Sequence, residues 1–261
     1  MAKGVVRELD LDAQTVTISH EAVSNFMGAM TMPFRVRGTA EIAGLHPGDE
    51  VTFRLHVTRT DSWVDQIVRS GTVPLSESKP SPPKLLPAHD QNPLWYYKFT
   101  NELGQAVSLN DFRGQALAIT FIYTRCPLPN YCPRLSKNFQ EASQKLDSLP
   151  TAPTNWHFLS VSFDPEFDTP AVLKAYGDSY QYDSKHWSFL TGPPDKIAEL
   201  ARMSGVSYES DNGLINHNLR TLIVNADGHL QTVFPFSGDF SDSIVSEIIK
   251  AATVTNQPGE H

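Results

Sequence analysis

Hydrophobic and polar residues alternate with a period of two along the first 70 residues, a pattern typical of β-strands with one buried face. The clearest runs are TVTISH at 15–20, MTMPFRV at 30–36 and VTFRLHV at 51–57, and turn-forming sequence such as LHPGDE separates them. In a unit of this length, short antiparallel strands predict a small all-β barrel of the OB type over residues 1–70.

The last two thirds of the chain alternate between strand and helix patterns instead. The run ALAITFIY at 116–123 is almost continuously apolar, which is typical of a strand buried on both faces. A helix should begin at Pro133, because apolar residues then recur at spacings of four and three. A second helix is predicted in DTPAVLKAY, where Thr169 is placed to cap the helix and Pro170 takes its first position.

The remaining segments complete the order of elements in this part of the chain. Strands are predicted in WHFLSVSF and WSFL, helices in PDKIAELARM and SDSIVSEIIKAA, and a hairpin around the turn at 226–228. Alternating strands and helices that end in a hairpin and a helix predict an α/β thioredoxin-like fold for residues 94–261.

A proline-rich stretch divides the two patterns. Residues 71–93 hold six of the nineteen prolines and few residues that could form a core. Such sequence favours extended, semi-rigid spacers. We therefore expect two domains, 1–70 and 94–261, joined by a linker at 71–93.

Composition and charge exclude several classes of partner. The chain has 261 residues and a formal net charge of −8, which argues against a nucleic-acid partner because no basic surface would neutralise phosphates. No run approaches the roughly 18 apolar residues that span a membrane. No basic segment followed by an apolar stretch begins the chain, so a secretory leader is absent and we expect that it has been removed.

Methionines are concentrated in one short segment. Three of the five, Met27, Met30 and Met32, lie within six residues, shortly after His20. The alternation places Met30 and Met32 on the same strand face. The cluster either fills the core, since Met packs well into irregular apolar space, or forms a soft metal site. Thioethers and an imidazole would suit Cu(I) or Ag(I).

Residues 4–36, GVVRELDLDAQTVTISHEAVSNFMGAMTMPFRV, resemble the CusF family of periplasmic Cu(I)- and Ag(I)-binding β-barrels. The resemblance implies metal ligands at His20, Met30 and Met32, followed by Phe34. Met27 stands where the family has a tryptophan that stacks over the metal. The resemblance therefore implies that a potential fourth soft ligand replaces a cation–π contact.

The chain has two cysteines, Cys126 and Cys132, which are too few for a disulfide scaffold. Cys126 follows the apolar strand and Cys132 lies at the start of the next predicted helix, where the helix dipole favours the thiolate. Five residues separate them. The pair could bind a metal, close as a disulfide or lie buried and inert, and the residues alone leave these alternatives open.

Residues 94–252 resemble the Sco/SenC family, thioredoxin-fold proteins that deliver copper to the dinuclear copper site of cytochrome c oxidase. The similar motifs are LNDFRGQALAITFIYTRCP, SVSFDPEFDTP, WSFLTG and LINHNLRTLIVNADG. The resemblance implies copper ligands at Cys126, Cys132 and His217, in which the sulfurs suit Cu(I) and the imidazole also suits Cu(II). The chain departs from the family in one respect, because five residues instead of the usual three separate the cysteines.

Other polar residues have two interpretations. Asp164, in FDPEFDTP, could lie near the copper-binding face or serve a turn or cap. The remaining histidines are predicted to be surface or turn residues, and they are His46, His56, His89, His157, His186 and His229.

We expect a periplasmic metallochaperone rather than an enzyme. The barrel would capture Cu(I), and the second domain would deliver copper to the oxidase subunit that carries the dinuclear site or to another periplasmic copper protein. Both copper sites should be solvent-accessible, since transfer requires a partner ligand to reach the ion. Thioether sites suit the periplasm, where competing thiols are scarce, and a membrane anchor in the native form is left open.

Two alternative functions remain. No catalytic residue is assigned, but Cys126 and Cys132 would be a redox-active pair in a thiol–disulfide oxidoreductase acting on oxidase cysteines. The second alternative is sequestration of copper or silver for resistance.

Overall fold

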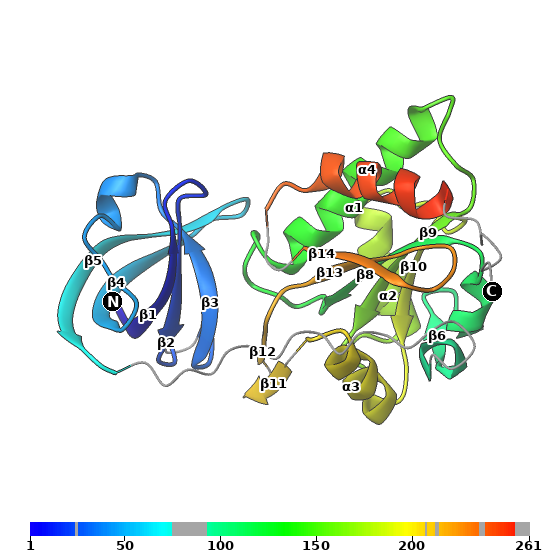
Figure 1. Ribbon diagram of the computed structural model, residues 1–261. Coiled ribbons are helices and arrows are strands. Elements are labelled where there is room, and N and C mark those ends of the chain that lie inside the picture. Colours follow the sequence, from blue (N-terminus) through cyan, green and yellow to red (C-terminus); the bar gives the residue numbers. More distant parts are fainter. Residues whose placement is uncertain (24–25, 75–92, 207, 212–213, 235–237, 254–261) are drawn as a thin grey trace, which may run out of the picture. The chain divides into compact units, whose positions relative to one another are not determined.

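A computed structural model describes the chain except residues 24–25, 75–92, 207, 212–213, 235–237 and 254–261 (Figure 1). The side chains of Met30 and of residues 93–94, 209–211 and 214–217 also lie outside the description. Most of the predicted linker falls in the undescribed part. Among the described residues, no helix combines the length and the apolar character that a membrane-spanning helix requires.

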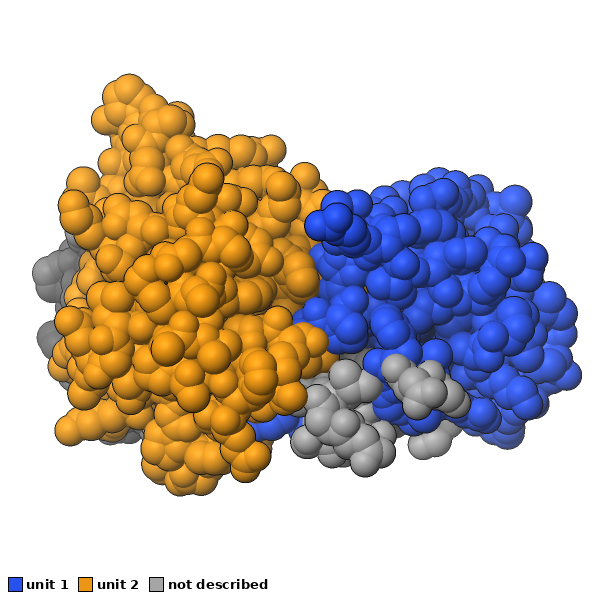
Figure 2. All heavy atoms as spheres, turned by 180° about the vertical axis from the view of Figure 1, so that it is seen from behind, with its two compact units in different colours: residues 1–81, 126–130, 207–218 blue, residues 82–125, 131–206, 219–261 orange. Residues whose placement is uncertain are grey.

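The chain divides into two compact units (Figure 2). The first comprises Met1–Ser81 together with Cys126–Asn130 and Ser207–Asn218. The second comprises Pro82–Arg125, Tyr131–Val206 and Leu219–His261. Two segments from the later part of the sequence, one of them beginning at Cys126, thus belong with the N-terminal residues.

The first unit contains a five-stranded antiparallel sheet in the order β3-β2-β1-β4-β5. Its strands are β1 (Ala2–Asp10), β2 (Thr15–His20), β3 (Met30–Arg35), β4 (Asp49–Val57) and β5 (Ser62–Thr72). A bridge between Val36 and Val64 joins the end of β3 to β5 and closes the sheet. The predicted small barrel of the OB type is confirmed.

Alternation along the strands fills the interior of this barrel. Val16, Ile18 and His20 of β2 are buried, while the residues between them are only partly covered. Phe34 and Phe53 pack with their ring centroids 5.2 Å apart. A period-two pattern therefore places an imidazole among core residues.

The second unit contains a seven-stranded mixed sheet in the order β14-β13-β8-β9-β10-β6-β7. β8, β9 and β10 are parallel, and their neighbours on both sides run antiparallel to them. The strands are β6 (Lys98–Asn101), β7 (Ala106–Ser108), β8 (Ala116–Ile122), β9 (Trp156–Ser162), β10 (Trp187–Thr191), β13 (Thr221–Val224) and β14 (Leu230–Phe234). The strands of the first unit's short hairpin are β11 (Tyr208–Asp211) and β12 (Leu214–His217).

Four helices accompany this sheet in the described part of the second unit. They are α1 (Cys132–Ser148), α2 (Pro170–Ser179), α3 (Pro194–Met203) and α4 (Ser241–Thr253). α1 and α4 pack against each other and against β8, while α2 packs on β10. The mixed sheet with its helices confirms the predicted thioredoxin-like fold.

Local signals in the sequence are realised at two places. The Thr169 side chain accepts a hydrogen bond from the backbone N–H of Val172, and Pro170 begins α2, as predicted. The turn between β13 and β14 closes through hydrogen bonds at Asn225, and Gly228 takes the left-handed backbone conformation with φ of 84°.

One histidine prediction is wrong. His157 lies on β9, a strand buried along its whole length, and only 5% of the residue is exposed. Its Nε2 lies 2.9 Å from the Ser188 hydroxyl, so the buried ring has a polar partner. A surface or turn position was predicted because a single histidine in an apolar run carries no signal of its own.

Candidate metal centres

The pairing of β2 with β3 brings the histidine and two of the methionines to one face. His20 stands opposite Met30, and Ile18 stands opposite Met32. Directly opposed residues of an antiparallel pair project from the same face of the sheet. Met32 is 1% exposed and His20 is 3% exposed, so this face is the inner one. The Met30 side chain itself lies outside the described residues.

The connection between β2 and β3 folds back on itself. Val23 donates a backbone hydrogen bond of 2.8 Å to the Met27 carbonyl and accepts one of 3.1 Å from the Met27 N–H. This bridge holds Met27 at the same end of the hairpin as His20 and Met30. Met27 is 5% exposed, which places its thioether in the barrel interior rather than in solvent.

The hydrogen bonding of His20 fixes its tautomer. Nδ1 lies 2.6 Å from the carbonyl oxygen of Glu21, and a carbonyl can only accept, so Nδ1 carries the proton. In the neutral ring Nε2 then presents a lone pair. Nε2 is buried and has no hydrogen-bond partner in the described structure. Burial also lowers the pKa of His20, although the bond to Glu21 opposes this effect, and the ring stays neutral near pH 7.

A buried polar atom without a partner costs about 1–3 kcal/mol, which favours a ligand at that atom. A neutral imidazole lone pair on the same strand face as Met30 and Met32 offers a donor set for a soft monovalent ion, whereas hard cations require oxygen ligands. The barrel residues therefore fit Cu(I) or Ag(I) as cargo. The ring of Phe34, 5.5 Å from that of His20, adds an apolar wall.

The two cysteines differ in their environments. Neither cysteine forms a disulfide in the described part of the chain. Cys126 follows β8 and is half-buried, and its sulfur lies 3.8 Å from the Leu128 carbonyl oxygen. Cys132 is the first residue of α1 and has no exposed surface.

The residues just before Cys126 are tied to the loop after β9. Asp168 is fully buried and accepts three hydrogen bonds, from the backbone N–H and the hydroxyl of Thr124 and from the hydroxyl of Ser162. Burial raises the pKa of Asp168, and these hydrogen bonds oppose the rise. No sequence pattern distinguished Asp168 from the other acidic residues of FDPEFDTP.

Asp164 has a different partner. Its Oδ2 accepts a bond of 2.6 Å from Nη2 of Arg125, whose guanidinium also lies 4.2 Å from the centre of the Phe167 ring. The Asp164 side chain therefore forms an ion pair with the residue that precedes Cys126, a role that neither interpretation of Asp164 included. Together Asp164 and Asp168 hold the chain that leads into the cysteine segment.

Tyr176 of α2 is close enough to Cys132 to interact with it electrostatically. The hydroxyl of Tyr176 is 3.0 Å from that of Ser136 and 3.4 Å from that of Tyr180. Burial raises the pKa of Tyr176 well above its usual value, and the negative charges that Tyr180 and Cys132 would carry raise it further. No sequence pattern pointed to Tyr176, because its role depends on the packing of α2 near the start of α1.

The structure leaves part of the predicted ligand sets outside its description. His217 ends β12 opposite Tyr208, but its side chain, like that of Met30, is not described. Within the described side chains, no group of three or more His, Cys, Asp and Glu residues could hold a metal ion. The methionine cluster is a different kind of candidate site, because its donors are thioethers.

The prediction of solvent-accessible sites is wrong for four candidate ligands. Cys132, His20, Met27 and Met32 are all buried, because each occupies an inward-facing position of a strand, a bridge or a helix start. Cys126 is the candidate ligand with described side-chain exposure to solvent. Ligand exchange at the buried positions therefore requires local opening.

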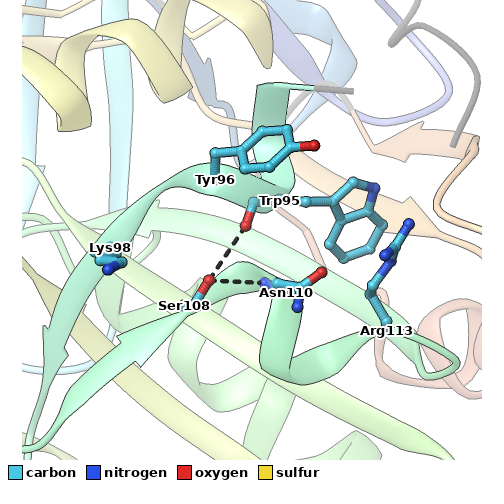
Figure 3. Close-up of a pocket in the computed structure, with 6 residues that line it drawn as sticks. All are labelled: Trp95, Tyr96, Lys98, Ser108, Asn110 and Arg113. Atoms are coloured by element: carbon cyan, nitrogen blue, oxygen red, sulfur yellow. Dashed lines mark hydrogen bonds between the residues drawn. The ribbon is translucent and has the colours of Figure 1, made fainter. Parts of the chain in front are cut away.

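A separate hollow of about 220 Å³ lies in the second unit (Figure 3). The Ser108 hydroxyl, which lines it, donates to the Trp95 carbonyl and accepts from the Asn110 N–H, both at 3.2 Å. Its lining is aromatic and cationic, with Trp95, Tyr96, Lys98, Ser108, Asn110 and Arg113. None of the candidate copper ligands is among these residues, so this hollow is not a candidate metal centre.

Two family models match the chain, one in each part of the sequence. Residues 89–253 match the model of the SCO1/SenC family, and residues 1–69 match that of the copper binding periplasmic protein CusF. The two matches together cover every candidate metal ligand.

Individual relatives are similar over the second match. The SCO1 protein homolog of Bacillus subtilis is 28% identical over 163 residues, which span 60% of this chain and 82% of that protein. The human mitochondrial SCO1 homolog is 26% identical, and the aligned part spans 53% of this chain and only 46% of that protein. Among solved structures, BsSco is 26% identical with a TM-score of 0.54 and covers 62% of this chain and 94% of its own. That protein is described as a Sco-family cytochrome c oxidase assembly protein with a disulfide switch.

Proposed function

The chain belongs to the SCO1/SenC family, and from this premise we propose that it is a periplasmic copper metallochaperone. Its N-terminal barrel captures Cu(I) with His20, Met27, Met30 and Met32. Its thioredoxin-like part holds copper with Cys126, Cys132 and His217 and delivers it for assembly of the dinuclear copper site of cytochrome c oxidase.

The observation that carries this proposal is the unpartnered Nε2 of His20. It is buried among the residues of the methionine strand, and the Glu21 carbonyl fixes its lone pair toward the interior. A core histidine such as His157 has a polar partner for the corresponding atom, whereas His20 has none in the described structure. A soft cation supplies the missing partner.

The choice of Cu(I) over harder ions follows from the donor atoms. Three thioethers and one neutral imidazole bring no negative charge, which suits a monovalent soft ion and leaves silver as a substitute. Thiolates at the second site would hold Cu(I) more strongly, and a histidine there also admits Cu(II). Copper would therefore move from the neutral donors to the charged ones.

The proposed location and partner have indirect support. Residues 1–69 match a family described as copper-binding and periplasmic. BsSco, which shares the fold of the second part, is described as an oxidase assembly protein. The partner is accordingly an oxidase subunit that carries the dinuclear copper site, or another periplasmic copper protein.

An anaerobic Cu(I) titration of the reduced protein against a chromogenic chelator tests the proposal. We expect two tightly bound equivalents, falling to one in the Cys126→Ser/Cys132→Ser variant and to one in the Met32→Leu variant. Met203→Leu is the matched control and keeps two, because Met203 lies outside the cluster and accepts a hydrogen bond from Tyr97.

Binding of a single equivalent by the unaltered protein, unchanged by the cysteine substitutions, would contradict the proposal. Copper would then be confined to the barrel, which corresponds to sequestration. Turnover of a disulfide substrate that requires Cys126 and Cys132, without copper bound at the pair, would instead support a thiol–disulfide oxidoreductase.

A further inference from the structure

The five-residue spacing between the cysteines has a structural use. The segment Cys126–Asn130 belongs to the first compact unit, together with the barrel strands (Figure 2). Leu128, in the middle of this segment, is 5% exposed, so the segment is packed rather than extended into solvent. Two extra residues relative to the usual family spacing lengthen the segment by up to about 7 Å.

Asn130 fixes this segment through its side chain. Its Nδ2 donates one hydrogen bond of 2.9 Å to Oδ1 of Asp61 and another of 2.9 Å to the backbone carbonyl of Ser62. Both amide hydrogens are used, which orients the whole side chain. An amide that donates both of its hydrogens in this way makes a specific contact with the residues that accept them.

The acceptors belong to a turn that is ordered by its own hydrogen bonds. Oδ1 of Asp61 also accepts from the backbone N–H of Ser62 at 2.9 Å. The backbone N–H of Asp61 donates to the Thr58 hydroxyl at 3.0 Å, and the Thr58 hydroxyl donates to the Asp61 carbonyl at 2.9 Å. Asn130 thus binds a preformed surface between β4 and β5.

The same carboxylate faces the methionine strand. Nη1 of Arg35 lies 3.6 Å from Oδ1 of Asp61, and Arg35 is three residues beyond Met32 on β3. The bridge between Val36 and Val64 holds β3 and β5 together at this point. Asp61 therefore contacts both the strand that carries the thioethers and the segment that follows Cys126.

We propose that Asn130 is a positioning residue for copper transfer, which holds the inter-cysteine segment on the Asp61–Ser62 turn and so keeps Cys126 with the barrel. This inference rests on the proposed function. In the transfer, Cu(I) loses its bonds to thioether sulfur and imidazole nitrogen and gains bonds to the cysteine sulfurs. The thiol protons pass to solvent, and no electron moves. A fixed segment lowers the entropic cost of the step by restricting where the accepting thiol can lie.

The test uses the full chain and a nearly isosteric change. Asn130→Asp places a carboxylate against the Asp61 carboxylate and the Ser62 carbonyl, so both donated bonds are replaced by repulsion. The reciprocal double change, Asn130→Asp with Asp61→Asn, lets an amide at position 61 donate to a carboxylate at position 130. Asn130→Ala is a second variant that removes the bonds without adding charge.

Sub-stoichiometric Cu(I), supplied as its acetonitrile complex, is mixed anaerobically with reduced protein, and the copper–thiolate absorption is followed by stopped flow. Transfer from the barrel is the slow, concentration-independent phase that disappears in Met32→Leu. We expect Asn130→Asp and Asn130→Ala to slow this phase about tenfold, as two lost hydrogen bonds would, and the double change to restore it. Asn155→Asp is the matched control, since Asn155 also donates to two backbone carbonyls but in the second unit.

An unchanged slow phase in Asn130→Asp, with two equivalents of copper still bound, would overturn the role of Asn130 and leave the proposed function intact. Absence of any slow phase in the unaltered protein would overturn it as well. Binding of one equivalent in the unaltered protein would overturn the proposed function and this inference together, and the titration alone identifies that case.

Discussion

Two buried histidines of this protein differ in one hydrogen bond. Nε2 of His157 lies 2.9 Å from the Ser188 hydroxyl, and the ring packs 4.6 Å from that of Phe112, as a core residue does. Nε2 of His20 has no partner in the described structure. Burial lowers the pKa of both rings. The satisfied histidine is therefore structural, and the unsatisfied one is the ligand candidate.

His157 should make stability depend on pH. Burial lowers its pKa to about 3 from 6.5, so below pH 6.5 the unfolded chain gains a proton that the folded chain does not. The free energy of unfolding should fall as pH drops through this window. At pH 5 this histidine would account for a loss of about 2 kcal/mol.

Urea unfolding at pH 7.5 and pH 5 measures this loss. His157→Gln keeps a polar group toward Ser188 but does not titrate. In this variant the free energy of unfolding should therefore differ between the two pH values by about 2 kcal/mol less than in the unaltered protein. An equal difference in the His157 variant and the unaltered protein would contradict the prediction.

The proposed barrel site has three thioether ligands if Met27 binds copper and two if Met27 only fills the core. Met27→Leu nearly conserves volume, so we expect it to change the free energy of unfolding by less than about 1.5 kcal/mol. If the thioether binds copper, the affinity of the barrel for Cu(I) should fall in a Cys126→Ser/Cys132→Ser background. Chelator competition measures this affinity. An affinity equal to that of Met203→Leu would show that Met27 only fills the core.

At the scale of elements, parallel pairing explains how the cysteine segment is held. β8 and β9 run side by side, with Ile122 opposite Ser162 at their carboxyl ends. The residues that follow the two strands therefore meet, and Asp168 bonds Thr124 just ahead of Cys126. The position agrees with the rule that α/β sheets place their functional groups beyond the carboxyl ends of strands.

Replacing the buried carboxylate of Asp168 should weaken its hydrogen bonds to Thr124, just ahead of Cys126. Asp168→Asn leaves a single acceptor oxygen and puts an amide N–H₂ against donors, so we expect a loss of about 1–3 kcal/mol in unfolding free energy. Chemical denaturation of the second unit measures it. Asp178→Asn is the control, because Asp178 is exposed and pairs with Lys174 along α2, and its change should stay within about 0.5 kcal/mol. A similar small change for Asp168 would contradict the assigned role.

Strands with strict alternation were predictable from the sequence, whereas β5, the longest strand of the barrel, and the short hairpins were not. Three strands of the barrel and the start of α2 agree with their patterns because alternation, Thr169 and Pro170 are local signals. The hairpins β6–β7 and β11–β12 were missed, since strands of three or four residues show no period. Alternation placed Met30 and Met32 on one strand face, but the pairing with His20, its burial and its lone Nε2 come from packing. Asn130, Asp168 and Tyr176 act through partners far away in sequence.

At the scale of the whole molecule, the chain carries separate ligand sets in two sequence regions that match different families. A chain of two compact units need not unfold in a single transition. Any ligand that binds only the folded form stabilises the unit that holds it. Thermal unfolding of the cysteine variant with copper therefore tests the barrel ligands, all of which lie in the first unit.

In the Cys126→Ser/Cys132→Ser variant, Cu(I) should raise the midpoint temperature of only one of the two unfolding transitions. At a free concentration of about 100 times Kd, the stabilisation would be about 2.7 kcal/mol for the barrel. Differential scanning calorimetry under anaerobic conditions measures both transitions. If copper raised the midpoint temperature of neither transition, or raised both midpoints equally, separate copper sites would be contradicted.

If the two thiols bind copper as proposed, their unequal exposure would give copper exchange an order in time. Cys126 is partly exposed to solvent, while Cys132 has no exposed surface. An acceptor protein could displace only a sulfur that it can reach, so its first new bond would replace the bond to Cys126. Cys132 would then release the ion last. The buried thiol would thus retain copper until the acceptor has bound it.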